Sequence, residues 1–133
     1  MVSGEKKALE HVEAIATELG AGRVIPLAVA GAFHSDLMKP ADQQLAEVLR
    51  DADLKSPRIP VYSNVDAAVH NDPEDIRRTL VEQVVAGVRW EDSVRNMMAD
   101  GFDSFYEIGP GRVLTGLLKR IDRKTACQSI AAR

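Results

Sequence analysis

One histidine lies where the sequence changes from apolar to polar. The stretch AGAFHSDLMKPA, residues 30–41, places His34 between an apolar run and the start of an amphipathic segment. In α/β folds the carboxyl ends of strands, ahead of the following helices, are where the chemistry takes place. A histidine at such a place is therefore a candidate for a role in the chemistry. The alternative is a histidine that only packs or caps.

Two other polar segments have structural interpretations beside their chemical ones. The segment GPGRV, residues 109–113, could hold an anion on its backbone N–H groups, but it lacks the Lys-Ser/Thr of a P-loop, so a tight turn is favoured. The stretch HNDPED, residues 70–75, contains side chains that could bind a metal. It is more typical of a surface loop followed by a helix cap.

The elements that must position His34 alternate between strands and helices. Apolar runs predict strands at residues 23–31, 58–65 and 102–108, with a short final strand at 126–130. Apolar residues at helical spacing predict helices at about 8–19, 37–48, 73–84, 88–98 and 113–121. This order implies an α/β fold with a parallel or mostly parallel sheet and flanking helices.

Composition limits the class of protein further. The 133 residues suffice for one domain, and 45% hydrophobic with 28% charged residues is ordinary for a globular protein. The net charge of −3 argues against a nucleic-acid partner. A single cysteine suits a reducing compartment, and no apolar run approaches the ~20 residues of a membrane span. The charged N-terminus has no apolar signal core. We therefore expect a soluble, cytoplasmic protein that binds neither nucleic acid nor membrane.

Four motifs together carry a family resemblance. They are AGAFHSDLMKPA, VYSNVDA, the pair LVEQVV and VRWEDSV, and FYEIGPGRVLTGLLKRI. Their order and spacing resemble the C-terminal part of the malonyl-CoA:acyl carrier protein transacylases and of the related acyltransferase domains of fatty-acid and polyketide synthases. The resemblance runs from about Val2 to Ile130. It implies a partial, α/β-hydrolase-like acyltransferase domain over residues 1–133. Residues 31–133 would be the C-terminal part of the large subdomain, and residues 1–30 a remnant of the small, ferredoxin-like subdomain.

The resemblance assigns roles to three residues, and position at a strand end suggests a fourth. His34 matches the family's histidine base, and Gln83 matches the glutamine whose backbone carbonyl holds the second ring nitrogen. Phe33 matches a position where phenylalanine goes with malonyl and a smaller serine goes with methylmalonyl, because the ring fills the space that an α-methyl branch needs. Asn64 would face the same crevice from the end of its strand. Bracing the turn is favoured there over contact with substrate.

The activity implied by the resemblance is transfer of a malonyl group from malonyl-CoA to the phosphopantetheine thiol of acyl carrier protein, in fatty-acid biosynthesis. The reaction passes through a serine ester and implies no metal or redox cofactor. The G-x-S-x-G elbow that carries the family's serine is absent from the 133 residues. The family's N-terminal glutamine motif and malonyl-binding arginine also belong to the missing half. We therefore expect a truncated or split enzyme whose N-terminal half is a necessary partner.

Two alternatives to this interpretation remain open. The chain could be a non-catalytic remnant or interaction domain that keeps the acyltransferase fold, or a complete, separate fold with its own activity. A neighbouring upstream reading frame that encodes G-x-S-x-G would favour the split transferase. Its absence would favour the remnant.

Overall fold

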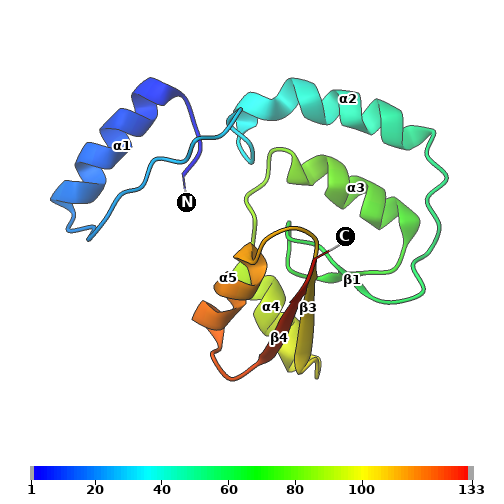
Figure 1. Ribbon diagram of the computed structural model, residues 1–133. Helices are drawn as coiled ribbons and strands as arrows, with labels where there is room; N and C mark the ends of the chain where they lie inside the picture. The colour runs from blue at the N-terminus through cyan, green and yellow to red at the C-terminus, as the bar shows by residue number, and fades with distance from the viewer. Residues whose placement is uncertain (1, 132–133) are drawn as a thin grey trace. The chain divides into compact units, whose positions relative to one another are not determined.

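The computed structural model describes residues 2–131 (Figure 1). In chain order its elements are α1 (Lys6–Glu18), the 3₁₀ helix η1 (Asp36–Met38), α2 (Lys39–Arg50), β1 (Val61–Tyr62), β2 (Val69–His70), α3 (Pro73–Gln83), α4 (Trp90–Ala99), β3 (Ser104–Ile108), α5 (Val113–Ile121) and β4 (Ala126–Ile130). The chain divides into two compact units. The first runs up to Ile59 and includes Asn71–Val88, and the second contains Pro60–His70 and the residues from Arg89 onward.

The second unit contains a β–α–β arrangement. Strands β3 and β4 pair in parallel, with Phe105 opposite Cys127, and α5 connects them and packs against both (Figure 1). Leu118 of α5 and Val94 of α4 are almost completely buried. The helical spacing of the apolar residues in α5 directs Leu118 inward, so the helix covers the sheet. The strand predicted at 126–130 is confirmed, the one predicted at 102–108 forms from Ser104 onward, and their parallel pairing agrees with the predicted mostly parallel sheet.

A short antiparallel hairpin replaces the longer strand predicted at residues 58–65. Only β1 forms there, and it pairs with β2 so that Val61 lies opposite His70 and Tyr62 opposite Val69. The chain turns back directly after β1, because Ser63 N–H donates to the Ala68 carbonyl oxygen at 3.0 Å. These turn hydrogen bonds end the strand after two residues. The predicted length was therefore wrong, and the antiparallel pairing was not foreseen.

The first unit contains two packed helices, α2 and α3. The start of α3 follows its sequence closely: the carboxylate of Asp72 accepts hydrogen bonds from the N–H groups of Glu74 (2.9 Å) and Asp75 (3.2 Å). Pro73 is the first helical residue, where its missing N–H is no loss. In α2, Pro40 lies in the first turn, as expected. Both predicted helices are confirmed.

The strand predicted at residues 23–31 does not form, so that prediction was wrong. The segment has no regular structure, and Ile25, Leu27 and Val29 are 58%, 61% and 66% exposed. A strand requires a neighbour for its backbone hydrogen bonds. Among residues 2–131 the segment pairs with no strand. An apolar run thus marks a segment that is able to form a buried strand, and pairing decides whether it does.

Helix α1 was predicted correctly, including its end. Gly20 follows with φ +85°, the left-handed conformation that glycine adopts most easily at a helix end. No side chain of α1 is buried. The subdomain boundary at residue 30 that the resemblance implies stays a prediction. Within the described residues no helix has the length and apolar character needed to cross a membrane.

Candidate functional site

The backbone of His34 adopts a conformation that is uncommon outside glycine. Its φ is +62°, in the left-handed region, and its N–H donates to the Val84 carbonyl oxygen at 3.1 Å. Val84 directly follows α3, so the end of this helix holds the loop that carries the histidine. Non-glycine residues in this region are often found at functional sites, where the surrounding structure compensates for the strain.

The imidazole of His34 is oriented by two carbonyl groups. Its Nδ1 lies 2.8 Å from the carbonyl oxygen of Gln83 and 3.1 Å from that of Ala86. Carbonyl oxygens only accept hydrogen bonds, so Nδ1 carries the proton. In the neutral ring Nε2 then has a free lone pair. None of the hydrogen bonds found among residues 2–131 involves Nε2 of His34. The half-buried ring is therefore arranged as a proton acceptor.

These carbonyl groups come from the last residue of α3 and from the segment directly after it. Gln83 is the last residue of the helix, and the last carbonyls of a helix have no partner within it. His34 uses the carbonyls of Gln83, Val84 and Ala86. The structure therefore brings together His34 and Gln83, which lie 49 residues apart in the sequence.

The side chain of Gln83 also takes part, which the sequence analysis missed. Its Nε2 donates to the carbonyl oxygen of Ala86 at 3.0 Å, the same oxygen that faces His34 Nδ1. The family resemblance assigned a role only to the backbone of this residue. A glutamine in the last turn of a helix is the signal that could have indicated this contact, because its amide reaches the carbonyls beyond the helix end.

Phe33 precedes His34 and presents its ring beside a glycine. The residue is 48% exposed, and the ring atom Cε2 would lie 3.6 Å from a Cβ atom placed on Gly31. The sulfur atom of Met38 would lie 3.8 Å from the same position. Both distances are ordinary van der Waals contacts, so a side chain at Gly31 would pack against the ring without a clash.

Asn64 belongs to the other compact unit and braces the start of α4. Its backbone oxygen accepts from the N–H of Arg89 at 2.8 Å. Its Oδ1 accepts from the hydroxyl of the buried Ser93 at 3.2 Å. These contacts connect the turn after β1 to the beginning of α4. They correspond to the structural role that the sequence analysis favoured for this residue.

Glu107 occupies the helix end that was considered as an anion site. Its buried carboxylate accepts from the N–H of Leu114 (3.0 Å) and from the N–H (2.9 Å) and hydroxyl (2.7 Å) of Thr115. These hydrogen bonds, that of the Thr115 N–H foremost, hold the pKa of Glu107 below its ordinary value despite the opposing effect of burial. The chain thus provides its own anion at the N-terminus of α5, and the interpretation of GPGRV as a turn is the better one.

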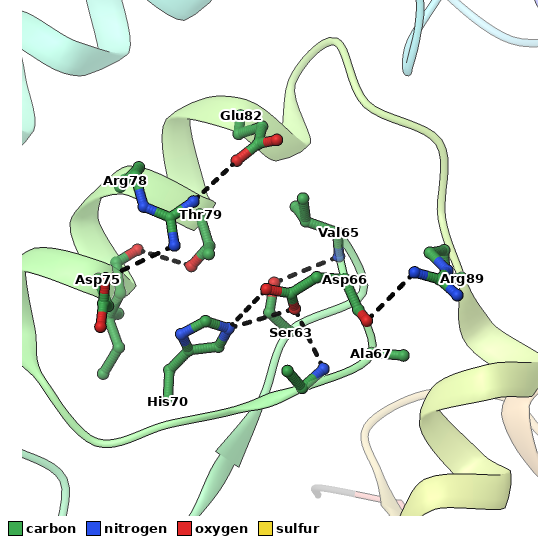
Figure 2. Close-up of polar contacts among 12 residues, drawn as sticks. Ser63, Val65, Asp66, Ala67, His70, Asp75, Arg78, Thr79, Glu82 and Arg89 are labelled. Carbon is green, nitrogen blue, oxygen red and sulfur yellow. Dashed lines mark hydrogen bonds and ion pairs between the residues drawn. The ribbon is translucent and has the colours of Figure 1, made fainter.

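A histidine–carboxylate pair closes the hairpin between β1 and β2. Figure 2 shows His70 Nε2 facing the carboxylate of Asp66, at 3.0 and 3.2 Å from its two oxygens. Burial raises the pKa of Asp66, but hydrogen bonds from the Ala68 N–H and from His70 outweigh it, so the pKa is lowered. Two of the polar residues of HNDPED, His70 and Asp72, therefore have structural partners, since Asp72 caps α3. Among the described residues no cluster could hold a metal ion.

The chain is similar in sequence to curated proteins of one name, although no family model matches it. It is 47% identical over 124 residues to the malonyl CoA-acyl carrier protein transacylase of Bacillus subtilis (strain 168), covering 93% of this chain and 39% of that protein. It is 42% identical over 121 residues to the protein of the same name from Escherichia coli (strain K12), covering 91% and 39%. The chain thus spans about two-fifths of the length of the curated relatives it matches.

Solved structures agree with the sequence comparison. An acyl carrier protein S-malonyltransferase from Vibrio cholerae matches with a TM-score of 0.92 and 39% identity, over 98% of this chain and 42% of that one. A malonyl-transacylase solved in complex with a type II polyketide acyl carrier protein matches with a TM-score of 0.92 and 41% identity, over the same shares. The predicted α/β acyltransferase fold is confirmed.

Proposed function

This chain is homologous to the C-terminal part of the malonyl CoA-acyl carrier protein transacylases, and we propose that it contributes the general base to a malonyl transfer reaction. The malonyl group moves from malonyl-CoA to the phosphopantetheine thiol of acyl carrier protein, in the cytoplasm and as a step of fatty-acid biosynthesis. The nucleophilic serine comes from outside these 133 residues, which contain no G-x-S-x-G pattern. The N-terminal half of the acyltransferase is therefore a required partner.

One observation carries the proposal: Nδ1 of His34 faces the Gln83 carbonyl at 2.8 Å, which leaves Nε2 to accept a proton. In the first half-reaction the serine hydroxyl gives its proton to Nε2 while its oxygen attacks the malonyl carbonyl carbon. The carbon–sulfur bond to CoA then breaks, and the leaving sulfur takes the proton from the imidazolium.

The second half-reaction repeats these steps in the opposite sense. The phosphopantetheine thiol gives its proton to Nε2, and its sulfur attacks the carbonyl carbon of the serine ester. The bond from that carbon to the serine oxygen breaks, and the serine recovers its proton from His34. Each step moves only a proton and an acyl group, so the proposed reaction requires no metal or redox cofactor. The complex of one structural neighbour with an acyl carrier protein supports this class of acceptor.

Two further residues have proposed roles. Phe33 favours malonyl over methylmalonyl, because its ring fills the space of the extra methyl group. Discrimination by one methyl group amounts to about 1–3 kcal/mol. Asn64 braces the turn after β1 within its own compact unit, in preference to contacting the substrate.

The proposal is tested by reconstitution. The chain is mixed with the separately produced serine-bearing half of a relative, and malonylation of acyl carrier protein is followed by intact-mass analysis. The chain alone should form no covalent malonyl adduct, and the mixture should transfer malonyl groups. A stoichiometric adduct on a serine of the isolated chain would show that it carries its own nucleophile. Transfer at the full rate by a mixture containing His34→Ala would show that His34 is not the base.

A non-catalytic interaction domain is the second candidate. The absence of a G-x-S-x-G pattern from these residues favours it. In that case the chain should bind the serine-bearing half, as measured by calorimetry, while the mixture transfers no malonyl group.

A further inference from the structure

We propose that the side-chain amide of Gln83 is a positioning group for His34, in addition to the backbone carbonyl of the same residue. The amide acts by holding the carbonyl of Ala86 against Nδ1 of the histidine. The effect on catalysis rests on the proposed function. The effect on the ring itself does not, because it concerns only hydrogen bonds within the first compact unit.

Two acceptors share the single proton on Nδ1 of His34. The Gln83 oxygen lies at 2.8 Å and the Ala86 oxygen at 3.1 Å, so the N–H forms a three-centre hydrogen bond. A carbonyl oxygen has two lone pairs, and that of Ala86 also accepts from Gln83 Nε2 at 3.0 Å. The two acceptors fix both the rotation of the imidazole and the position of its proton. Rotation of the ring by half a turn would place a C–H group against both oxygens.

The second acceptor lies in a loop and needs support. Ala86 follows the end of α3, and its N–H donates to the Glu82 carbonyl at 2.8 Å. Its carbonyl group is oriented by the Gln83 amide, which also lies 3.5 Å from the carbonyl oxygen of Gly87. Both neighbours are acceptors, so the amide nitrogen must point toward them. Glutamate at this position would have no hydrogen to donate, and asparagine would be one methylene group too short.

Loss of the amide should change the tautomer balance of His34. The Gln83 backbone carbonyl remains, so the proton stays on Nδ1 in part of the molecules. A single hydrogen bond contributes enough to shift such an equilibrium about 2- to 10-fold. The fraction of rings with a free Nε2 should fall accordingly, and kcat for malonyl transfer should fall with it. KM for malonyl-CoA should stay unchanged, because the amide acts on the ring and not on the substrate.

Nitrogen NMR of the 133-residue chain labelled with ¹⁵N-histidine tests the proposal, because protonated and unprotonated ring nitrogens have well-separated shifts. The chain has three histidines, which substitution can assign. In the wild type the His34 signals should show the Nδ1–H form. Gln83→Met, of similar length but without a donor, should show a mixture of the two forms. The matched control is Gln43→Met, an exposed position on α2, which should leave the His34 signals unchanged.

Either of two results would overturn the proposal: a wild-type ring protonated on Nε2, or Gln83→Met signals identical to those of the wild type. The tautomer of the wild-type ring tests the proposal even if Gln83→Met does not fold. Gln83→Glu is a polar second variant, for which a mixture of the two tautomers is also expected. These results are distinct from failure of the proposed function. That failure would appear as malonyl transfer unaffected by His34→Ala, whatever the tautomer of the ring.

Discussion

At the scale of single residues, the site depends on which atoms of His34 are engaged and which are free. Nδ1 and the backbone N–H both donate to carbonyls from the end of α3, at 2.8 and 3.1 Å. Within residues 2–131 no hydrogen bond engages Nε2 of His34. The histidine is thus held by the fold at one side and available for chemistry at the other.

Replacing His34 with alanine in the reconstituted enzyme should lower the rate of serine acylation by about 10²- to 10⁴-fold, the usual contribution of a general base. The reason is that the serine loses its proton acceptor. Rapid-quench kinetics with malonyl-CoA measures the rate. The control is His11→Ala, since His11 is exposed on α1 and, within the described part of the chain, its ring bonds only to the Lys7 carbonyl. If His34→Ala instead melts much earlier than the wild type and keeps its turnover, His34 serves packing and not catalysis.

Glu107 should make the protein sensitive to acid. Its pKa is below the ordinary value because the N–H and hydroxyl of Thr115 bond to the charged carboxylate. A lowered pKa in the folded state stabilises the protein above the ordinary glutamate pKa of about 4.3, and this stability is lost as the pH falls through the folded-state value. Glu107→Gln should therefore melt at a lower temperature at pH 7 and lose less stability between about pH 5 and 2.

Thermal melting as a function of pH checks this expectation. Asp66 and Asp122 also have a lowered pKa, so the variant should keep part of the acid sensitivity. A variant with the wild-type pH profile would show that the carboxylate of Glu107 is not important for holding α5.

At the scale of elements, α3 connects a local sequence signal to the candidate site. Its N-terminus is fixed by the Asp72 cap, and its C-terminus supplies the acceptors of His34. The position of the histidine thus depends on a helix whose start is encoded ten residues or so earlier. A weaker helix start should therefore lower the free energy of unfolding and also weaken the hydrogen bonds of His34 to the end of α3.

Replacing the cap, Asp72→Ala, should lower the free energy of unfolding by about 1 kcal/mol, within the 0.5–2 kcal/mol range of such caps. The N–H groups of Glu74 and Asp75 would lose their acceptor. Urea unfolding followed by circular dichroism gives the value. Asp72→Asn is the matched control, because asparagine caps a helix about as well. Equal stabilities of Asp72→Ala and the wild type would contradict a role for the cap.

At the scale of the whole molecule, several large apolar side chains are exposed to solvent. Ile25, Leu27 and Val29 are each more than half exposed, as are Ile108 and Val113. Each 100 Å² of apolar area that stays in water means a loss of about 2.5 kcal/mol of hydrophobic stabilisation. The stabilisation lost when a few hundred Å² stay exposed is therefore comparable with the ~5–15 kcal/mol free energy of unfolding of a typical domain.

We therefore expect the isolated chain to be marginally stable or to self-associate, and to become stable and monodisperse with the serine-bearing half. Sedimentation velocity and thermal melting measure both properties. Serine at positions 25, 27 and 29 together should reduce self-association. Leu19→Ser should not, because this exposed residue at the end of α1 lies outside the unpaired run. A sharply melting monomer of the wild-type chain would show that it is a self-sufficient domain.

The sequence by itself determined the helices and their ends. Asp72 with Pro73 begins α3, Gly20 follows the end of α1, and the apolar spacing in α5 predicts its buried face. These features rest on interactions between residues three or four apart, which a single sequence displays directly. The family motif also identified His34 and Gln83, although no local pattern connects the two.

Tertiary structure alone decided which apolar runs become strands, how long β1 is, and which distant residues form hydrogen bonds. The run at 23–31 has strand-forming residues but no partner, and β1 ends early because the chain turns back to pair with β2. The Gln83 amide that holds Ala86 against His34, and Glu107 at the start of α5, were likewise not foreseen. Strand pairing and buried polar contacts depend on which distant groups come within about 3 Å of each other. That proximity is a property of the folded chain, and no stretch of its sequence specifies it.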